Sequence, residues 1–293
     1  MPNERPLTFH PGQDFLFKYC SARGIDILQS LRLKVSPPNQ FNDPFEFLPR
    51  VDFPIDETDV KKWMTDPERL RSIWEESALQ IPFEDFLATI RKEYENVGLE
   101  RVARFQRILQ DLALQHQSDL VDFLSETYAL ACYSEIPDNS LMWSHYADGH
   151  RGIVVEFNLK NSFFASPVNL MPVSYRSERA SAKYDSEGFA LDEHELSAVR
   201  IKNLVWSYER EWRQLFQVKD CMEIQNPDGT CFYVSIPSDA IASVIFGVRC
   251  RPETEKKIVG ELKKRPDLQH VRLSRAVLHE RDFKINVVPV DDK

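Results

Sequence analysis

The sequence predicts an α+β protein whose helices gather in one block and whose strands lie mostly in the second half of the chain. Three observations lead to this fold class. Strand-like alternation opens the chain, helical periodicity with dense charge runs from about residue 56 to 128, and short apolar runs return after Tyr128. Segregated helices and strands are typical of α+β folds. We expect a single domain over residues 1–293, with a helical insertion at about 56–128.

The first half begins with a strand and a short helix. "DFLFKYCS" alternates, with Phe15, Phe17 and Tyr19 on one face, which predicts a strand. "GIDILQSLRLKVSPP" predicts a short helix and then an extended piece that ends at two prolines. "NQFNDPF" has the residues of a turn. In the insertion, apolar residues recur at helical spacing, as at Phe105 and Leu109.

The second half contains short strands separated by loops. The expected strands are "YALACYS", "GIVVEF", "MPVSYRS", "EWRQLFQV", "ASVIFGV" and "FKINVVP". The stretch "EIPDNSLMWSHYADGHRG" predicts a loop with a short helix. A further helix is expected from Asp192 to about Trp206, because Ile201, Val205 and Tyr208 keep the helical period.

Composition limits the classes of function. The net charge of −9 gives no general electrostatic attraction to nucleic acid, although it does not exclude a local basic groove that binds nucleic acid. The 5 cysteines form no CxxC pair, so we expect neither a metal nor a redox motif, and this cysteine usage is typical of a reducing cytosol. The first residues, "MPNERPLTFH", lack the apolar core of a signal peptide, and no apolar run is long enough to span a bilayer. We therefore expect a cytoplasmic protein that does not bind membranes.

"YEREWRQLF" is the first candidate site. If residues 209–215 are extended, then Glu209, Glu211 and Arg213 point to the same side of the strand. One interpretation is an edge strand with an ion pair, which contributes little at a surface. The other is a carboxylate held rigidly so that it stabilises a developing positive charge, as in glycosyl transfer.

Aromatic and polar residues form two further candidate clusters. Trp143, His145 and Tyr146 lie in "LMWSHYADGHRG" and could cover the core or stack on a flat ligand. Asn42 and Asp43 could form only a turn or could close a pocket. Lys18 could face solvent or meet an anion in a cleft.

Several blocks together resemble the bacterial domain-of-unknown-function family DUF2971. They are "FLFKYCS", "FNDPFEF", "CYSEIPDNSLMWSHYADGHRGIVVEF", "PVSY", "KNLVWSYEREWRQLF" and "SVIFG", in this order over most of residues 14–247. The family name itself implies no activity.

The block order is also similar to that of ADP-ribosyltransferases, especially DarT-type toxins that modify nucleic acid. This resemblance implies a split mixed or antiparallel sheet core with NAD as substrate in its cleft. It implies Glu211 as the catalytic carboxylate, with Glu209 completing a Glu-x-Glu arrangement. The implied cofactor-binding residues are Lys18, Tyr19, Asn42, Asp43, Tyr133, Trp143, His145, Tyr146, Tyr175 and Arg213. Two departures are Lys18, where those enzymes have arginine, histidine or threonine, and the absence of a Ser-Thr-Ser strand.

The resemblance implies a toxin or phage-defence effector that modifies a protein, RNA or DNA, and an antitoxin or defence-system partner for it. Two other classes stay open. The same blocks could build a non-catalytic sensor or partner-binding module, in which the charged strand is an internal ion-pair network. A metal-dependent nuclease would need a carboxylate cluster, which Asp43, Glu156 and Glu211 could supply after folding.

Overall fold

The computed structural model describes most of the chain, which forms two compact units. The described residues are 13–52, 62, 64–77, 80–94, 107, 118–165, 169–185, 188–191, 197–227 and 229–290. Unit 1 comprises Met1–Asp43, Leu124–Ser177 and Arg200–Lys293, and unit 2 comprises Pro44–Phe123 and Glu178–Val199. Each unit is described by itself.

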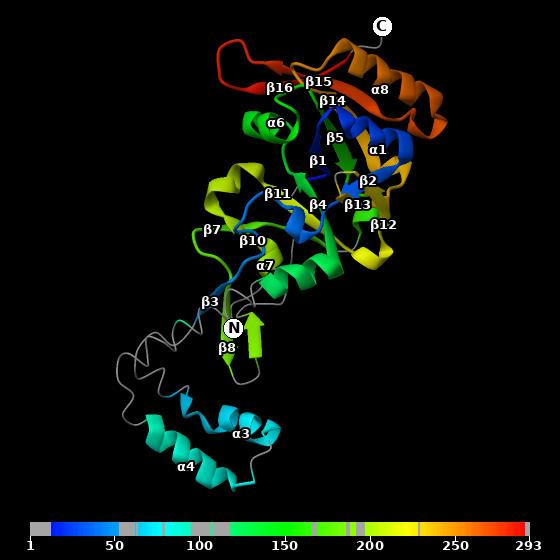
Figure 1. Cartoon of the computed structure of the whole chain (residues 1–293). Helices are drawn as coiled ribbons and strands as arrows, with labels where there is room; N and C mark the ends of the chain where they lie inside the picture. Colours follow the sequence, from blue (N-terminus) through cyan, green and yellow to red (C-terminus); the bar gives the residue numbers. More distant parts are fainter. Residues whose placement is uncertain are drawn as a thin grey trace. The chain divides into compact units, whose positions relative to one another are not determined.

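An eight-stranded mixed sheet is the centre of unit 1 (Figure 1). Its order is β16-β15-β14-β5-β1-β4-β11-β6. The strands are β1 (Phe15–Cys20), β4 (Tyr128–Ser134), β5 (Ile153–Asn158), β6 (Leu170–Pro172), β11 (Glu211–Gln217), β14 (Ile241–Phe246), β15 (Arg272–Leu278) and β16 (Ile285–Pro289). Strands β14 and β15 are parallel and all other neighbours antiparallel. A parallel pair needs a crossover, which helix α8 (Pro252–Lys264) supplies. The predicted α+β class is confirmed.

Both faces of this sheet carry an apolar cluster, because successive side chains in a strand point to opposite sides. Val155 of β5 belongs to one cluster, which α8 also joins through Ile258. Val154 belongs to the other, together with Trp143 of helix α6 (Ser140–Tyr146). The central strands are therefore buried on both sides, and side chains on them are held rigidly.

Smaller elements complete unit 1. A three-stranded antiparallel sheet contains β2 (Arg32–Val35), β12 (Met222–Asn226) and β13 (Gly229–Ser235). Strands β7 (Ser174–Arg176) and β10 (Ile201–Asn203) form a parallel pair that sets Lys202 beside Tyr175. Besides α6 and α8, the unit contains helix α1 (Ile25–Ser30) and the 3-10 turns η1 (Ala22–Gly24), η2 (Pro38–Gln40), η3 (Ser162–Phe164), η4 (Leu204–Glu209), η5 (Val218–Asp220), η6 (Ser238–Ala240) and η7 (Pro266–Leu268).

The "ADGHRG" stretch is a tight loop that brings β5 close to two other segments. Asp148, Gly149 and His150 all have positive φ, where glycine is least strained. A Cβ on Gly152 would collide with the Cys20 carbonyl oxygen, and one on Gly247 with that of His150. The glycine at position 152 is therefore required by packing.

Unit 2 contains helices and a small sheet. Strands β3 (Arg50–Asp52), β8 (Ser181–Asp185) and β9 (Gly188–Leu191) form the sheet. Helices α3 (Pro67–Glu76) and α4 (Phe83–Tyr94) pack through Leu70, Phe83 and Leu87, and both lie in the range where the sequence predicts an insertion. Residues 118–123 of this unit are also helical. No helix among the described residues of the chain is long and apolar enough to cross a membrane.

One predicted helix is wrong. In place of a helix from Asp192 to Trp206, the described part contains α7 (Ser197–Arg200), then strand β10 and the turn η4. Ile201 is buried whereas Val205 is 70% exposed, so their spacing does not mark one buried face. The Asn203 side chain accepts a hydrogen bond from the Val205 N–H, which starts the turn. Residues 192–196 and the Phe105–Leu112 periodicity, Arg107 excepted, lie outside the described residues.

Candidate active site

The charged strand begins at a sharp backbone turn. Glu209 ends η4, Arg210 has a left-handed backbone with φ of 44°, and Glu211 starts β11. The condition that residues 209–215 are all extended is therefore not met at the first two residues, whereas the expected strand "EWRQLFQV" is present as β11. The Ser134 hydroxyl donates to the Glu209 carbonyl at 2.6 Å, and the Glu135 N–H donates to the Arg210 carbonyl at 3.1 Å. These bonds to β4 and its end fix the turn.

Lys202 bridges the two glutamates. Its Nζ lies 2.6 Å from Glu209 Oε2 and 3.0 Å from Glu211 Oε2, and all three side chains are buried. The carboxylates of Glu209 and Glu211 thus meet through a cation on another strand. Sequence reasoning missed Lys202, because the expected helix gave no reason to place it beside them.

Arg213 holds the Glu211 carboxylate from the other side. Its Nε donates to Glu211 Oε1 at 2.9 Å and its Nη2 donates to Oε2 at 3.1 Å. The guanidinium fork matches a carboxylate in this bidentate way, which fixes direction as well as charge. Arg213 is 0% exposed, so this pair is not an ordinary surface ion pair.

Two tyrosines complete what we call the glutamate network, which comprises Tyr146, Tyr175, Lys202, Glu209, Glu211 and Arg213. The Tyr146 hydroxyl donates to Glu209 Oε1 at 2.6 Å. The Glu211 N–H donates to the Tyr175 hydroxyl oxygen at 2.7 Å. Burial, together with the hydrogen bond to Glu209, raises the pKa of Tyr146, whereas a hydrogen bond with the Asn42 side chain lowers it. Burial also raises the pKa of Tyr175. Both hydroxyls therefore stay protonated at neutral pH.

The two glutamates have opposite pKa shifts. Burial raises the pKa of Glu209, and the charge of Lys202 only partly opposes it. Burial would also raise the pKa of Glu211, but the charges of Arg213 and Lys202 outweigh it and lower that pKa to about 2. Glu211 is consequently ionised at every physiological pH.

Glu211 lies in the wall of a hollow of about 590 Å³, called here the Glu211 hollow. This volume is within the usual range of about 300–1,000 Å³ for small-molecule sites. The lining residues are Gln13, Glu135, Ile136, Pro172, Val173, Tyr175, Ser207, Arg210 and Glu211. Arg210 is exposed in this wall, and sequence reasoning did not single it out.

Other expected site residues pack elsewhere. Trp143 is 0% exposed and its Nε1–H donates to the Pro137 carbonyl at 2.7 Å. The Tyr133 hydroxyl donates to Gln214 Oε1 at 2.9 Å inside the core, and the Tyr19 hydroxyl donates to the Ile136 carbonyl at 2.9 Å. Because neither Trp143 nor Tyr133 has an accessible ring face, we assign both to packing rather than to stacking on a ligand.

Of the remaining expected site residues, Asn42 contacts the glutamate network through Tyr146, whereas Lys18 does not bind either glutamate. Lys18 Nζ donates to the Cys132 carbonyl at 3.2 Å and makes no hydrogen bond or ion pair with either glutamate. His145 is exposed, with its ring 6.2 Å from that of Tyr146. Asn42 is exposed and reaches Tyr146, whereas Asp43 is buried. The structure thus brings Asn42, Tyr146, Tyr175, Glu209, Glu211 and Arg213 together around Lys202.

A family model matches the segment that carries this network. Residues 142–214 match DUF2971, described as a protein of unknown function. The DUF2971 resemblance is confirmed over these residues. The matched segment is less than a third of the chain, yet it runs from helix α6 to Gln214 and contains all six residues of the glutamate network. No curated protein and no solved structure matches the chain.

The described residues do not bring candidate metal ligands together. No group of three or more His, Cys, Asp and Glu side chains there could hold a metal ion. Glu156, one of the three carboxylates named for the nuclease hypothesis, lies on β5 and accepts a hydrogen bond from Ser243. That hypothesis therefore gains no support.

The lowered pKa of Glu211 predicts an acid-sensitive contribution to stability. Its folded-state pKa, about 2, lies below the ordinary value of 4.5, so the contribution is fully present above pH 4.5 and is lost as pH falls toward 2. We expect wild type to be more stable than Glu211→Gln at pH 7, and the difference to shrink below pH 4.5. Urea unfolding of both proteins from pH 7 to 3 measures this. A difference that stays constant with pH would contradict the ionic role of Glu211.

Proposed function

We propose that this chain transfers ADP-ribose from NAD⁺ to a macromolecular acceptor, with Glu211 as the catalytic carboxylate. The observation that carries the proposal is that Glu211, whose ionised carboxylate is held by Lys202 and Arg213, is one of the residues that line a ligand-sized hollow. Perturbed carboxylates in hollows of this kind are candidates for catalysis. The resemblance of the block order to ADP-ribosyltransferases supports the choice of reaction.

The chemistry needs a fixed negative charge beside the ribose. In the proposed step the bond between ribose C1′ and the nicotinamide nitrogen breaks, and nicotinamide leaves with the bonding electron pair. Glu211 stabilises the oxocarbenium-like ribose that results. The acceptor nucleophile then forms a bond to C1′ and loses its proton. Glu209 orients this acceptor, which is a protein, RNA or DNA.

The Glu211 hollow offers chemistry suited to the substrate NAD⁺. Arg210 supplies an exposed guanidinium for a pyrophosphate, and guanidinium groups bind phosphate oxygens in pairs. Tyr175 supplies an aromatic ring in the same wall. Of the aromatic residues expected at the nicotinamide, Tyr146 is the one that keeps a partly exposed ring within the network.

The direct test combines purified protein, NAD⁺ and bacterial lysate. Nicotinamide release and a labelled ADP-ribose adduct are expected together when lysate is present. Nuclease or protease treatment of the labelled product identifies the acceptor class. Neither release nor adduct in any lysate fraction would contradict the proposal.

Arg210→Gln is expected to weaken NAD⁺ binding about tenfold, because it removes the cation that faces the pyrophosphate. Isothermal titration calorimetry measures this, with a non-hydrolysable NAD⁺ analogue as ligand. Arg23→Gln, another exposed arginine outside the hollow, is the matched control and should bind like wild type. Equal affinity of all three proteins for the analogue would show that Arg210 does not contribute to NAD⁺ binding.

The biological role that we propose is a toxin or phage-defence effector in the bacterial cytoplasm, held in check by an antitoxin or defence-system partner. Inducible expression in a bacterial host tests it. Growth arrest with wild type and normal growth with Glu211→Gln, at equal protein levels, is the expected result.

A non-catalytic sensor or partner-binding module is the second candidate. The observation that favours it is the closure of the network, since Glu211 is 5% exposed and already accepts hydrogen bonds from Lys202 and Arg213. Buried charges that are fully paired can serve to fix one conformation. In calorimetry such a module would not bind NAD⁺ or its analogue, whereas the proposed enzyme would.

A further inference from the structure

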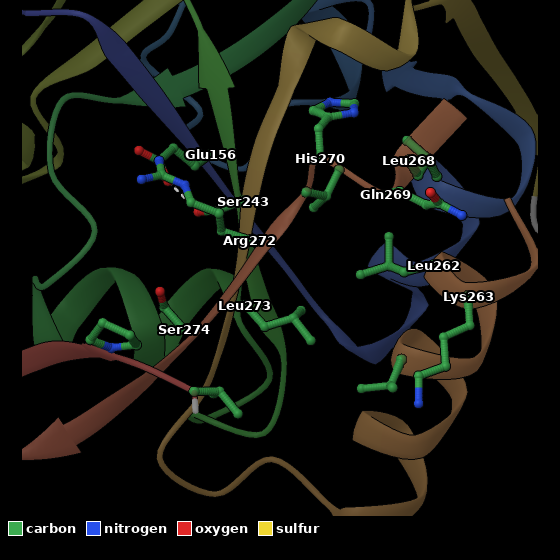
Figure 2. A pocket seen from close by; sticks show the side chains of 14 residues that line it. Glu156, Ser243, Leu262, Lys263, Leu268, Gln269, His270, Arg272, Leu273 and Ser274 are labelled. Atoms are coloured by element: carbon green, nitrogen blue, oxygen red, sulfur yellow. Dashed lines mark hydrogen bonds and ion pairs between the residues drawn. The ribbon is translucent and has the colours of Figure 1, made fainter. Parts of the chain in front are cut away.

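A second hollow, of about 770 Å³, lies in unit 1 and shares no lining residue with the Glu211 hollow. We call it the Glu156 hollow. It opens where β15 begins, between the end of α8 and strands β5 and β14 (Figure 2). Strands β1 and β4 separate β5 from β11 in the sheet, so the two sites are roughly 14 Å apart across the strands alone.

Glu156 presents an unused acceptor to this hollow. Its side chain is 13% exposed, and Oε2 takes both of its contacts, a hydrogen bond from the buried Ser243 hydroxyl and an ion pair with Arg272 Nη2 at 3.8 Å. Oε1 has no partner in the described part of the chain and is not sealed from solvent. A carboxylate held by a buried hydroxyl, with one oxygen left open, is prepared to accept a hydrogen bond from a ligand.

Two cationic side chains, Arg272 and Lys263, line the same hollow, and their charged groups are accessible to a ligand. The Arg272 side chain is 68% exposed, and its 3.8 Å contact with Glu156 is too long for a hydrogen bond. Lys263, on α8, is exposed and makes no ion pair with a described residue. Figure 2 shows the Lys263 side chain on the helix across the hollow from Glu156.

Apolar side chains form the remainder of the lining. Leu262 and Leu268 are buried, and Leu273 is half-buried. Burying apolar ligand surface here would add to any polar contact. The lining thus combines a hydrogen-bond acceptor, cationic groups and an apolar wall. A matching ligand carries a hydrogen-bond donor, an anionic group and an apolar group.

We propose that the Glu156 hollow binds a small zwitterion with an apolar side chain, that is, a primary ammonium, a carboxylate and an aliphatic group in one molecule. The ammonium donates to Glu156 Oε1, the carboxylate pairs with Arg272, which lies beside Glu156, and the aliphatic group lies against the leucines of the lining. A simple anion fits less well, because the Glu156 carboxylate repels it. Free apolar amino acids and short apolar peptides both carry this chemistry.

Calorimetry on the full chain tests the proposal with four probes. L-leucine and L-leucyl-L-leucine carry all three parts, whereas 3-methylbutylamine lacks the carboxylate and 4-methylpentanoate lacks the ammonium. We expect at least one zwitterion to bind, and both single-charge analogues to bind about tenfold more weakly or worse. Preference for leucine or for the dipeptide identifies the source of the ligand.

Variants decide whether Glu156 makes the contact. Glu156→Gln keeps the shape and the Ser243 hydrogen bond but removes the charge, so we expect about tenfold weaker binding with an unchanged melting temperature. Glu280→Gln, an exposed glutamate outside the hollow, is the matched control. No binding of either zwitterion up to about 10 mM, or equal affinity in Glu156→Gln and wild type, overturns the proposal.

Discussion

Lys202→Met is expected to lower the free energy of unfolding by about 3–5 kcal/mol at pH 7, the range for removing one partner of a buried ion pair. Lys202 is the cation that both Glu209 and Glu211 contact, and all three side chains are buried. Methionine keeps the length of the side chain but leaves Glu209 without its cation. Urea unfolding at equal temperature measures the loss.

Three controls separate this effect from ordinary packing loss. Lys256→Met changes an exposed lysine on α8 and should alter stability by less than about 0.5 kcal/mol. Adding Glu209→Gln to Lys202→Met should restore part of the loss, because it removes the carboxylate that has lost its partner. The loss should also shrink as pH falls, since burial raises the pKa of Glu209 and lets it take up a proton. A loss no larger than that of Lys256→Met would show that the network does not stabilise the fold.

Strands with a clear alternation could be predicted from the sequence, but the site could be predicted only in part. The runs at β1, β4, β5 and β14 are short, apolar and bounded by turns, and local pattern is enough to recognise them. Lys202 is different, because it meets Glu211 only after β10 has paired with β7. A pairing between distant segments leaves no local periodicity in the sequence.

Aromatic residues in the "LMWSHYADGHRG" stretch show the same limit. Trp143 and Tyr146 are three residues apart on α6, and nothing in the sequence distinguishes them. Trp143 is buried in the core and packs edge-to-face against Tyr19, with the ring centroids 5.4 Å apart, whereas the Tyr146 hydroxyl donates a hydrogen bond to Glu209. The position of α6 over β1 decides which aromatic is buried, and that position comes from tertiary packing.

Glu211→Gln is expected to reduce ADP-ribose transfer about 10²- to 10³-fold, the usual cost of removing one group that stabilises transition-state charge. The amide keeps the size of the side chain and can still accept hydrogen bonds from Arg213, but it carries no negative charge to oppose the oxocarbenium-like ribose. The loss should appear in kcat more than in KM, because the ground state of NAD⁺ has little charge at C1′ for Glu211 to recognise.

Two further variants keep this prediction decisive even if Glu211→Gln loses stability. Glu211→Asp retains the negative charge but shortens the side chain by one methylene. This variant should therefore transfer ADP-ribose faster than Glu211→Gln and more slowly than wild type. Glu209→Gln should release nicotinamide with water as acceptor while losing transfer to the macromolecule, because Glu209 orients the acceptor in the proposed mechanism. Equal transfer rates in wild type and Glu211→Gln would exclude Glu211 as the catalytic carboxylate. Glu211→Asp no faster than Glu211→Gln would show that geometry, rather than charge, limits the reaction.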